Sequence, residues 1–117
     1  MEIKDFYEKL NGDFQDACER LFNPGMVDRF VRKFPSDPSM QQLRDAVKEG
    51  DIEAQFRAVH TLKSVAGVLS FTPLFKAAWA LTEQLRPRLN TADALLLENL
   101  EQEYRRTISL LSEYISG

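Results

Sequence analysis

One histidine and one lysine are the residues of this 117-residue chain whose types and spacing best suit nucleophilic chemistry. His60 is the only histidine, and Lys63 follows it by three residues. Side chains at this spacing are neighbours on a helix surface. Imidazole changes its charge near neutral pH, so a large neutral and nucleophilic fraction is available. A lysine ammonium one turn away offsets negative charge on a group attached to that nucleophile, although an exposed attraction is worth only about 1 kcal/mol.

The segment at residues 52–69 is expected to be the helix that carries this pair. At about 100° per residue, from 3.6 residues per turn, its apolar residues form one broad stripe that faces the core. These residues are Ile52, Ala58, Val59, Leu62, Val65, Ala66 and Leu69. His60 lies roughly 150° from the centre of the stripe, so its side chain is expected to point into solvent.

The side of the helix that carries His60 differs from an ordinary solvated face. Five residues on or beside it are candidate docking or close-approach positions for a partner: Phe56, Arg57, Ser64, Gly67 and Phe71. Glycine inside a helix costs about 1 kcal/mol relative to alanine, so Gly67 indicates close approach by a partner or by another helix of the same bundle. Phe56 fits the core edge or a docking surface. Phe71 fits a docking surface or a fold over the helix end.

Composition and missing motifs exclude several other classes of function. The net charge of −3 speaks against a nucleic-acid partner, and no apolar run approaches the roughly 18 residues that span a bilayer. The opening MEIKDFYEKL is no secretion signal, so a cytoplasmic location is expected. Cys18, the single cysteine, permits no internal disulfide. No metal-ligand cluster and no glycine-rich nucleotide loop is recognisable.

Helix start and stop signals divide the chain into amphipathic helices. Breaks are expected at Asn11-Gly12, Asn23-Pro24, Pro35, Gly50-Asp51 and Thr72-Pro73, and from Pro87 to Thr91. A long apolar stripe then runs from Leu97 to Ile115, and no segment alternates like a strand. Short connections favour antiparallel neighbours. The prediction is therefore an all-α, up-and-down antiparallel four-helix bundle with additional short N-terminal helices, as one domain over residues 1–117.

The string around His60 resembles a family signature. In AVHTLKSVAGVLSFTPL, the residues Ala58, His60, Leu62 and Lys63 resemble the A-H-x-L-K-G pattern of histidine-containing phosphotransfer (HPt) domains, with Val59 inserted between alanine and histidine. LFKAAWALTEQLR resembles the helix that follows in the family, and the likeness covers about residues 30–88. Two serines depart from the pattern. Ser64 and Ser70 stand where the family most often has glycine, which puts docking efficiency in question.

The resemblance implies a free-standing phosphorelay carrier without kinase activity. By this likeness, His60 takes a phosphoryl group through Nε2 from a receiver-domain aspartate or a sensor kinase and passes it to another receiver. Lys63 supports the phosphate charge, and the Ser64 hydroxyl can donate to a phosphoryl oxygen. Magnesium would belong to the receiver, and no cofactor to this chain. Receiver domains and a hybrid sensor histidine kinase are the expected partners of a monomer without membrane contact.

Two further points belong to the same prediction. Thr82 and Lys76, on the helix after His60, are candidates for the phosphate region. The alternative function is a catalytically silent helical adaptor that binds a receiver or another signalling partner through the surface around His60. Retention of His60 and Lys63 speaks against the adaptor, whereas Ser64 in place of glycine speaks for it.

Overall fold

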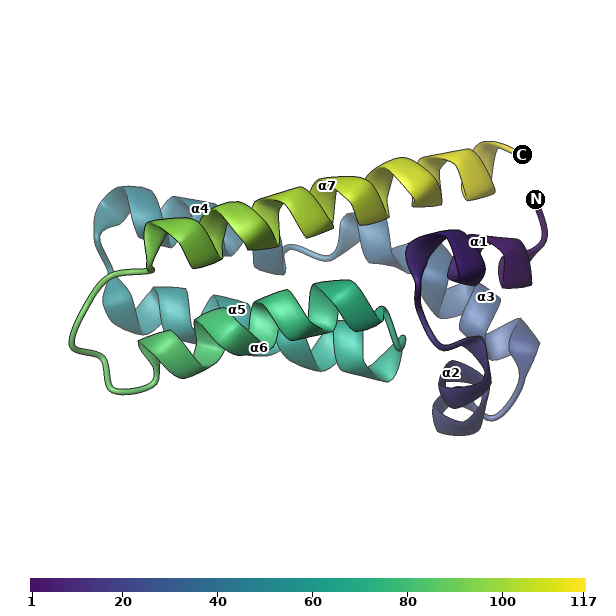
Figure 1. Cartoon of the computed structure of the whole chain (residues 1–117), viewed down its shortest axis with the longest axis horizontal. Helices are drawn as coiled ribbons and strands as arrows, with labels where there is room; N and C mark the ends of the chain where they lie inside the picture. Colours follow the sequence, from purple (N-terminus) through teal and green to yellow (C-terminus); the bar gives the residue numbers. More distant parts are fainter.

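The computed structural model describes all 117 residues, and its regular structure is entirely helical (Figure 1). Seven α-helices and one 3-10 turn follow one another along the chain. They are α1 (Ile3–Leu10), α2 (Phe14–Leu21), α3 (Pro24–Lys33), η1 (Phe34–Ser36), α4 (Ser39–Glu49), α5 (Ile52–Val68), α6 (Thr72–Leu85) and α7 (Ala94–Ser116). The predicted all-α class is confirmed. None of these helices is long and apolar enough to cross a bilayer.

Capping residues explain where four of the helices begin. Asp13, Asn23, Asp51 and Asp93 each accept a hydrogen bond from a backbone N–H in the first turn of the helix that follows. These bonds satisfy donors that a helix start leaves without an intrahelical partner. Gly50 ends α4 with a left-handed φ of 70°, a conformation that glycine adopts without steric cost.

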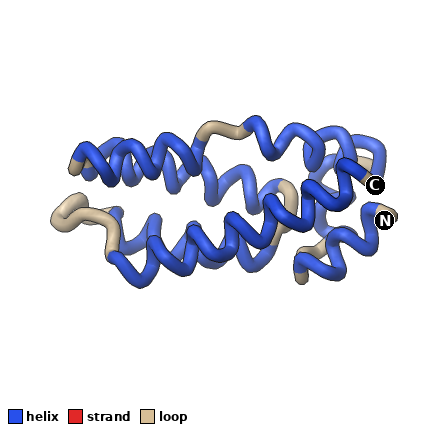
Figure 2. Tube along the Cα trace, turned by 90° about the horizontal axis from the view of Figure 1, so that it is seen from above, coloured by secondary structure: helices blue, strands red, loops and turns tan.

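Four long helices form the bundle, and three short helices close one end of it. α5 packs between α4 and α6, and α7 packs against α6. Figure 2 shows these helices running side by side, with both termini at the same end of the molecule. α1 packs against α7, and α2 against α3, at the end where α5 turns into α6 (Figure 1). The predicted four-helix bundle with short N-terminal helices is confirmed.

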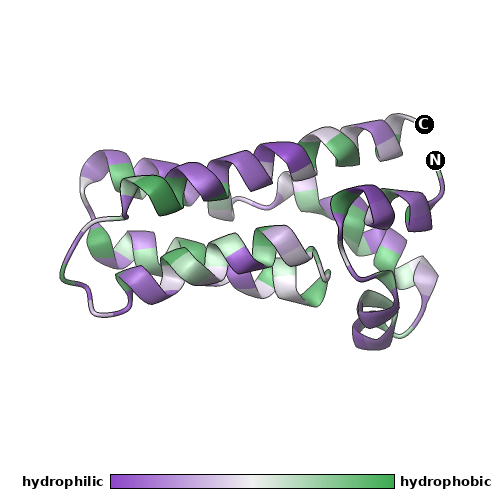
Figure 3. Ribbon diagram, viewed as in Figure 1, coloured by the Kyte–Doolittle hydropathy of each residue, from purple (hydrophilic) through white to green (hydrophobic).

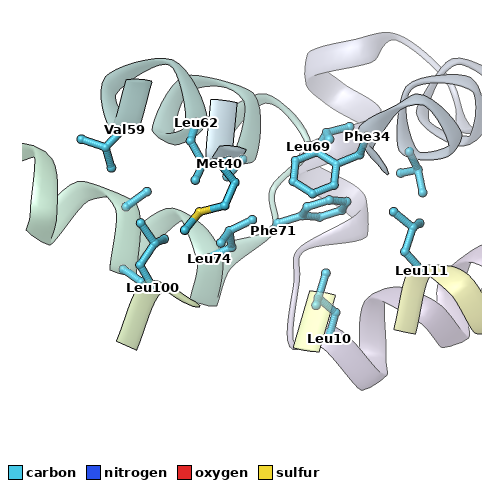
Figure 4. Packing of buried hydrophobic residues seen from close by; sticks show 14 of the residues in the cluster. Leu10, Phe34, Met40, Val59, Leu62, Leu69, Phe71, Leu74, Leu100 and Leu111 are labelled. Carbon is cyan, nitrogen blue, oxygen red and sulfur yellow. The ribbon is translucent and has the colours of Figure 1, made fainter. Parts of the chain in front are cut away.

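The core runs the length of the bundle and becomes aromatic where the short helices meet it. Leu62, Leu74, Leu81 and Leu100 are fully buried between the long helices, and Figure 4 shows Leu62 and Leu74 converging with Met40. Coloured by hydropathy, α5 and α6 carry extended green stretches, whereas much of α7 is purple (Figure 3). α5 therefore has a continuous apolar face to hold it, which leaves its outer face free for other roles.

An aromatic cluster joins the N-terminal helices to the turn after α5. Phe71 lies at its centre, with ring centroids 5.8 Å from Phe6, 5.8 Å from Tyr7 and 5.3 Å from Phe34. The Tyr7 hydroxyl donates a 2.7 Å hydrogen bond to the Leu69 carbonyl. Burial raises the pKa of Tyr7 above its ordinary value, as desolvation does for any group that is neutral when protonated. This cluster anchors the C-terminal end of α5.

Candidate functional site

His60 lies in the middle of α5 on the face that points away from the core. Its neighbours Val59 and Leu62 are fully buried, whereas His60 is exposed. No protein group hydrogen bonds to the imidazole; only the His60 backbone carbonyl accepts a side-chain bond. The orientation predicted from the apolar stripe is therefore confirmed. Both ring nitrogens are free of protein partners, so the imidazole can present a lone pair to an electrophile.

The ring of Phe56 packs beside the imidazole of His60. The two ring centroids are 5.7 Å apart with 33° between the planes. Phe56 itself is only 8% exposed and joins the core cluster. The prediction of Phe56 as a docking residue is therefore wrong, because its ring is covered by its own protein. Of the two roles open from sequence, the structure selects the core edge.

Arginines from the α6–α7 connection cover the outer side of Phe56. The Arg88 guanidinium carbon lies 3.5 Å from the centre of the Phe56 ring, and that of Arg86 lies 5.4 Å away. Arg88 Nε donates a 2.9 Å bond to Glu53, and Arg88 Nη1 donates a 2.7 Å bond to the Arg86 carbonyl. Sequence reasoning missed both arginines. Counting outwards from the turn at Phe71 in two antiparallel helices would have placed Arg86 opposite Phe56.

Lys63 lies one turn beyond His60 and is partly buried towards α6. It helps to lower the pKa of Glu83, although the hydrogen bond from Arg86 is the larger cause. Arg86 alone forms the ion pair with Glu83, and no hydrogen bond or ion pair holds the Lys63 ammonium. A lysine in this position is free to turn towards a new anion on His60.

Ser64 and Arg57 occupy the exposed surface on either side of His60. The Ser64 hydroxyl donates a 3.0 Å hydrogen bond to the His60 carbonyl, one turn back in the helix. This back-bonding is common for serine inside helices, and it occupies the proton that was expected for a phosphoryl oxygen. Arg57 makes a loose ion pair with Glu53 at 3.9 Å, and its side chain is 71% exposed. Both residues remain accessible to a partner.

The space beside Gly67 is taken by α6. A Cβ atom added at Gly67 would lie 3.2 Å from the Phe75 ring, closer than side chains normally approach. The contact with the neighbouring helix that the sequence left open is therefore present, and close approach of a partner at Gly67 remains a prediction. The Gly67 backbone still lines a surface groove, together with Lys63 and Ser64.

Two grooves meet the His60 face at Ser64. The apolar one, about 460 Å³, lies between α3 and α5 and is lined by Phe30, Phe34, Val65 and Val68, with Lys33 at its rim. The other, about 410 Å³, lies between α2, α5 and α6 and is lined mostly by residues with polar side chains. Ser64 belongs to both grooves, so any larger side chain at this position would project into the surface between them.

Besides Phe56, two more of the predicted site residues are buried and cannot contact a partner. Phe71 is fully buried in the aromatic cluster, so its proposed docking role is wrong. Thr82 is also fully buried, and its hydroxyl donates a 2.7 Å bond to the Ala78 carbonyl. It lies on the core side of α6 with Ala78 and Leu85, so it cannot reach a phosphate on His60.

Lys76 is exposed on α6 and remains a prediction. It follows Phe75, the residue that packs on Gly67. Gly67 is seven residues beyond His60, which corresponds to about two helical turns. Any contact of the Lys76 ammonium with a group on His60 would therefore have to bridge that separation, in contrast to Lys63 on the adjacent turn.

Comparison with known families agrees with this all-helical bundle and its exposed histidine. A family model described as the Hpt domain matches residues 25–111, which is most of the chain. The chain therefore belongs to the Hpt domain family, whose members are phosphocarriers in two-component signalling and interact with receiver domains and histidine kinases. No curated protein and no solved structure gives a significant match.

Proposed function

We propose that His60 is the phosphoacceptor of a phosphorelay. In the proposed transfer, the Nε2 lone pair of a neutral imidazole attacks the phosphorus of an aspartyl phosphate on a receiver domain. The N–P bond forms as the bond between phosphorus and the aspartyl oxygen breaks, and the aspartate leaves as a carboxylate. The reverse step delivers the group to a second receiver. The observation that carries the proposal is that the only histidine of an Hpt chain stands exposed, with no protein hydrogen bond to its ring.

Lys63 would support the transferred group by charge. Its ammonium lies one turn from His60 and has no fixed hydrogen-bond partner. An exposed ion pair contributes about 1 kcal/mol, so this role adjusts the rate and the lifetime of phosphohistidine without creating the nucleophile. We assign the magnesium ion of the reaction to the receiver, and we propose that the chain acts as a monomer.

Ser64 and Arg57 would form the surface that a receiver approaches. Both are exposed next to His60, and Ser64 lies where the two grooves meet. In-line attack needs reacting atoms about 3–3.5 Å apart, so small size at position 64 matters more than its hydroxyl, which already bonds to the His60 carbonyl. The serine can therefore stand in for the glycine that the family usually has.

The test is phosphoryl transfer from a labelled, aspartate-phosphorylated receiver domain to the parent chain and to His60→Gln. We expect an acid-labile, base-stable label on the parent and none on the variant. Because His60 is exposed and surface changes usually alter stability by less than about 0.5 kcal/mol, melting should be unchanged. Labelling of His60→Gln would refute the assignment, since the chain has no second histidine. A parent that binds receivers without taking label would be the silent adaptor.

A further inference from the structure

A column of three side chains in contact begins in the α6–α7 connection and ends at the imidazole of His60, whose ring is tilted by 33° to its neighbour. Its members are Arg88, Phe56 and His60, with contacts of 3.5 Å from guanidinium carbon to ring centre and 5.7 Å from ring centre to ring centre. We propose that Phe56 and Arg88 are positioning residues that hold the His60 ring in one rotamer for phosphoryl transfer. This inference rests on the proposed function of His60.

Helix geometry explains why Phe56 is the residue that His60 touches. Side chains on an α-helix point back towards the N-terminus, so the side chain of a residue lies over the turn before it. Phe56 is four residues before His60 and occupies that turn. The Phe56 ring at this position contacts the imidazole, with 33° between the two ring planes. The edge with the two nitrogens makes no hydrogen bond to the protein, so the support does not block the nucleophile.

Phe56 is in turn held by more than the core. The Arg88 guanidinium covers the ring from outside, an arrangement that the negative face of an aromatic ring favours. Two bonds direct the guanidinium there, one to Glu53 at 2.9 Å and one to the Arg86 carbonyl at 2.7 Å. A single charged side chain on a surface is normally mobile. One tied at two points and stacked on a ring is restricted, and it restricts the ring beneath it.

The backbone of Arg88 adopts a conformation that is unusual for a residue with a side chain. Arg88 has a φ of 57°, in the left-handed region that non-glycine residues rarely enter. Its N–H donates to the Leu85 carbonyl at 2.9 Å and so closes the end of α6. A glycine would fit this backbone with less strain. The substitution Arg88→Gly therefore removes the arginine side chain without adding strain to the backbone of the connection.

The experiment uses NMR of the full chain together with phosphorylation by a small phosphoramidate donor. His60 is the only histidine, so its signals are unambiguous, and the couplings between its Hα and Hβ protons report the χ1 rotamer. For Arg88→Gly and for Phe56→Leu we expect rotamer averaging at His60 and labelling about two- to fivefold slower, the size of an exposed cation–π contact. Melting curves confirm that both variants fold.

The matched control is Arg105→Ala. Arg105 lies on α7, which packs against α6 and α1, and its side chain is 65% exposed. The substitution removes one positive charge, as Arg88→Gly does, but leaves the column unchanged. We therefore expect the His60 couplings and the labelling rate of the parent chain. Slowing by Arg105→Ala equal to that of Arg88→Gly would overturn the proposal, because net charge would then be the cause. Unchanged couplings, or averaged couplings with an unchanged rate, would also overturn it.

These outcomes are separate from those that test His60 itself. The couplings are measured on the unphosphorylated chain, so they do not depend on transfer. If His60→Gln retains its label, the proposed phosphoacceptor is wrong whatever the column does. If only His60→Gln loses the label, while Arg88→Gly and Phe56→Leu keep the parental rate, the phosphoacceptor stands and the column has no positioning role.

Discussion

The outer face of α5 and the turn that closes α5 belong to one short stretch of chain, yet they have opposite physical roles. Each holds a serine where the resemblance to the Hpt signature places a glycine. Ser64, on the outer face, is exposed and bonds only to its own helix. Ser70, in the turn, is 6% exposed, has a φ of 53° and donates a hydrogen bond to Asp16. Serine in place of glycine therefore changes only the surface at position 64. At position 70 it places a non-glycine residue in a left-handed backbone conformation.

This difference separates the residues proposed to act in phosphoryl transfer from the residues that stabilise the fold. The outer face contributes the proposed nucleophile, His60, and a lysine but few buried atoms, so its residues can change without unfolding the bundle. The closing turn contributes Phe71 and the Leu69 carbonyl, which tie α5 to the N-terminal helices. Substitutions on the face should change phosphoryl transfer at constant stability, and substitutions in the turn should do the reverse.

The largest expected effect is that of Phe71→Ala. Removing a fully buried aromatic side chain costs about 3–5 kcal/mol, from lost burial and the cavity that remains. Chemical denaturation should show this loss, whereas His60→Gln should stay within about 0.5 kcal/mol of the parent. If Phe71→Ala melts like the parent, the turn does not anchor α5, and the contrast between the two regions fails.

Ser64→Gln should lower the rate of transfer from a phosphorylated receiver by at least about tenfold, because small displacements from attack geometry are costly. Ser64→Gly is the matched control. It should keep or raise the rate, at a helix-propensity cost of about 0.5 kcal/mol. Rates measured by label appearance, with melting alongside, check both. Equal rates for the glutamine variant and the parent would mean that receivers approach from another side, over Arg57.

Lys63→Ala should slow transfer about fivefold, the equivalent of roughly 1 kcal/mol for a screened surface cation. The lifetime of phosphohistidine should shorten as well, since a compensating charge is removed. Quenched time courses of label transfer measure the rate, and the decay of the label on the isolated chain measures the lifetime. A variant as inactive as His60→Gln would show that Lys63 positions the helix or the partner, and does not merely supply charge.

Ser70→Gly should have the smallest effect, below about 1 kcal/mol. Glycine relieves the left-handed backbone, worth roughly 1–2 kcal/mol, but the hydrogen bond to Asp16 is lost. Transfer should be unchanged. A stability loss of several kcal/mol at neutral pH would show that the serine side chain, not the backbone conformation, determines this turn.

The same substitution predicts a pH dependence. The Ser70 hydrogen bond, and secondarily that of Arg20, hold the pKa of Asp16 below its ordinary 3.8. A carboxyl with a depressed pKa stabilises the fold above its unfolded pKa and loses this contribution as pH falls through its folded pKa. Unfolding free energies measured from pH 7 down to below pH 3.8 should therefore shift in favour of Ser70→Gly relative to the parent. A constant difference across this range would contradict the Asp16 contact.

Much of this protein follows from sequence because its signals are local. Capping residues such as Asp13 and Asp51 satisfy backbone groups within the first turn of the helix that follows, so these helix starts were predictable. Helical periodicity depends on one helix alone, so it correctly turned His60 away from the stripe that contains Val59 and Leu62. The family signature around Lys63 added the chemistry.

Tertiary structure alone decided which of the aromatic, glycine and threonine residues near His60 remain accessible. Periodicity sets the direction of a side chain about its own helix axis, but not which neighbour covers it. Phe71 was judged by its place after the helix, yet N-terminal residues bury it. Gly67 proved to accommodate Phe75, and Phe56 is covered by Arg88 from the far end of α6. Such contacts join residues distant in sequence, so they exist only once the helices have packed.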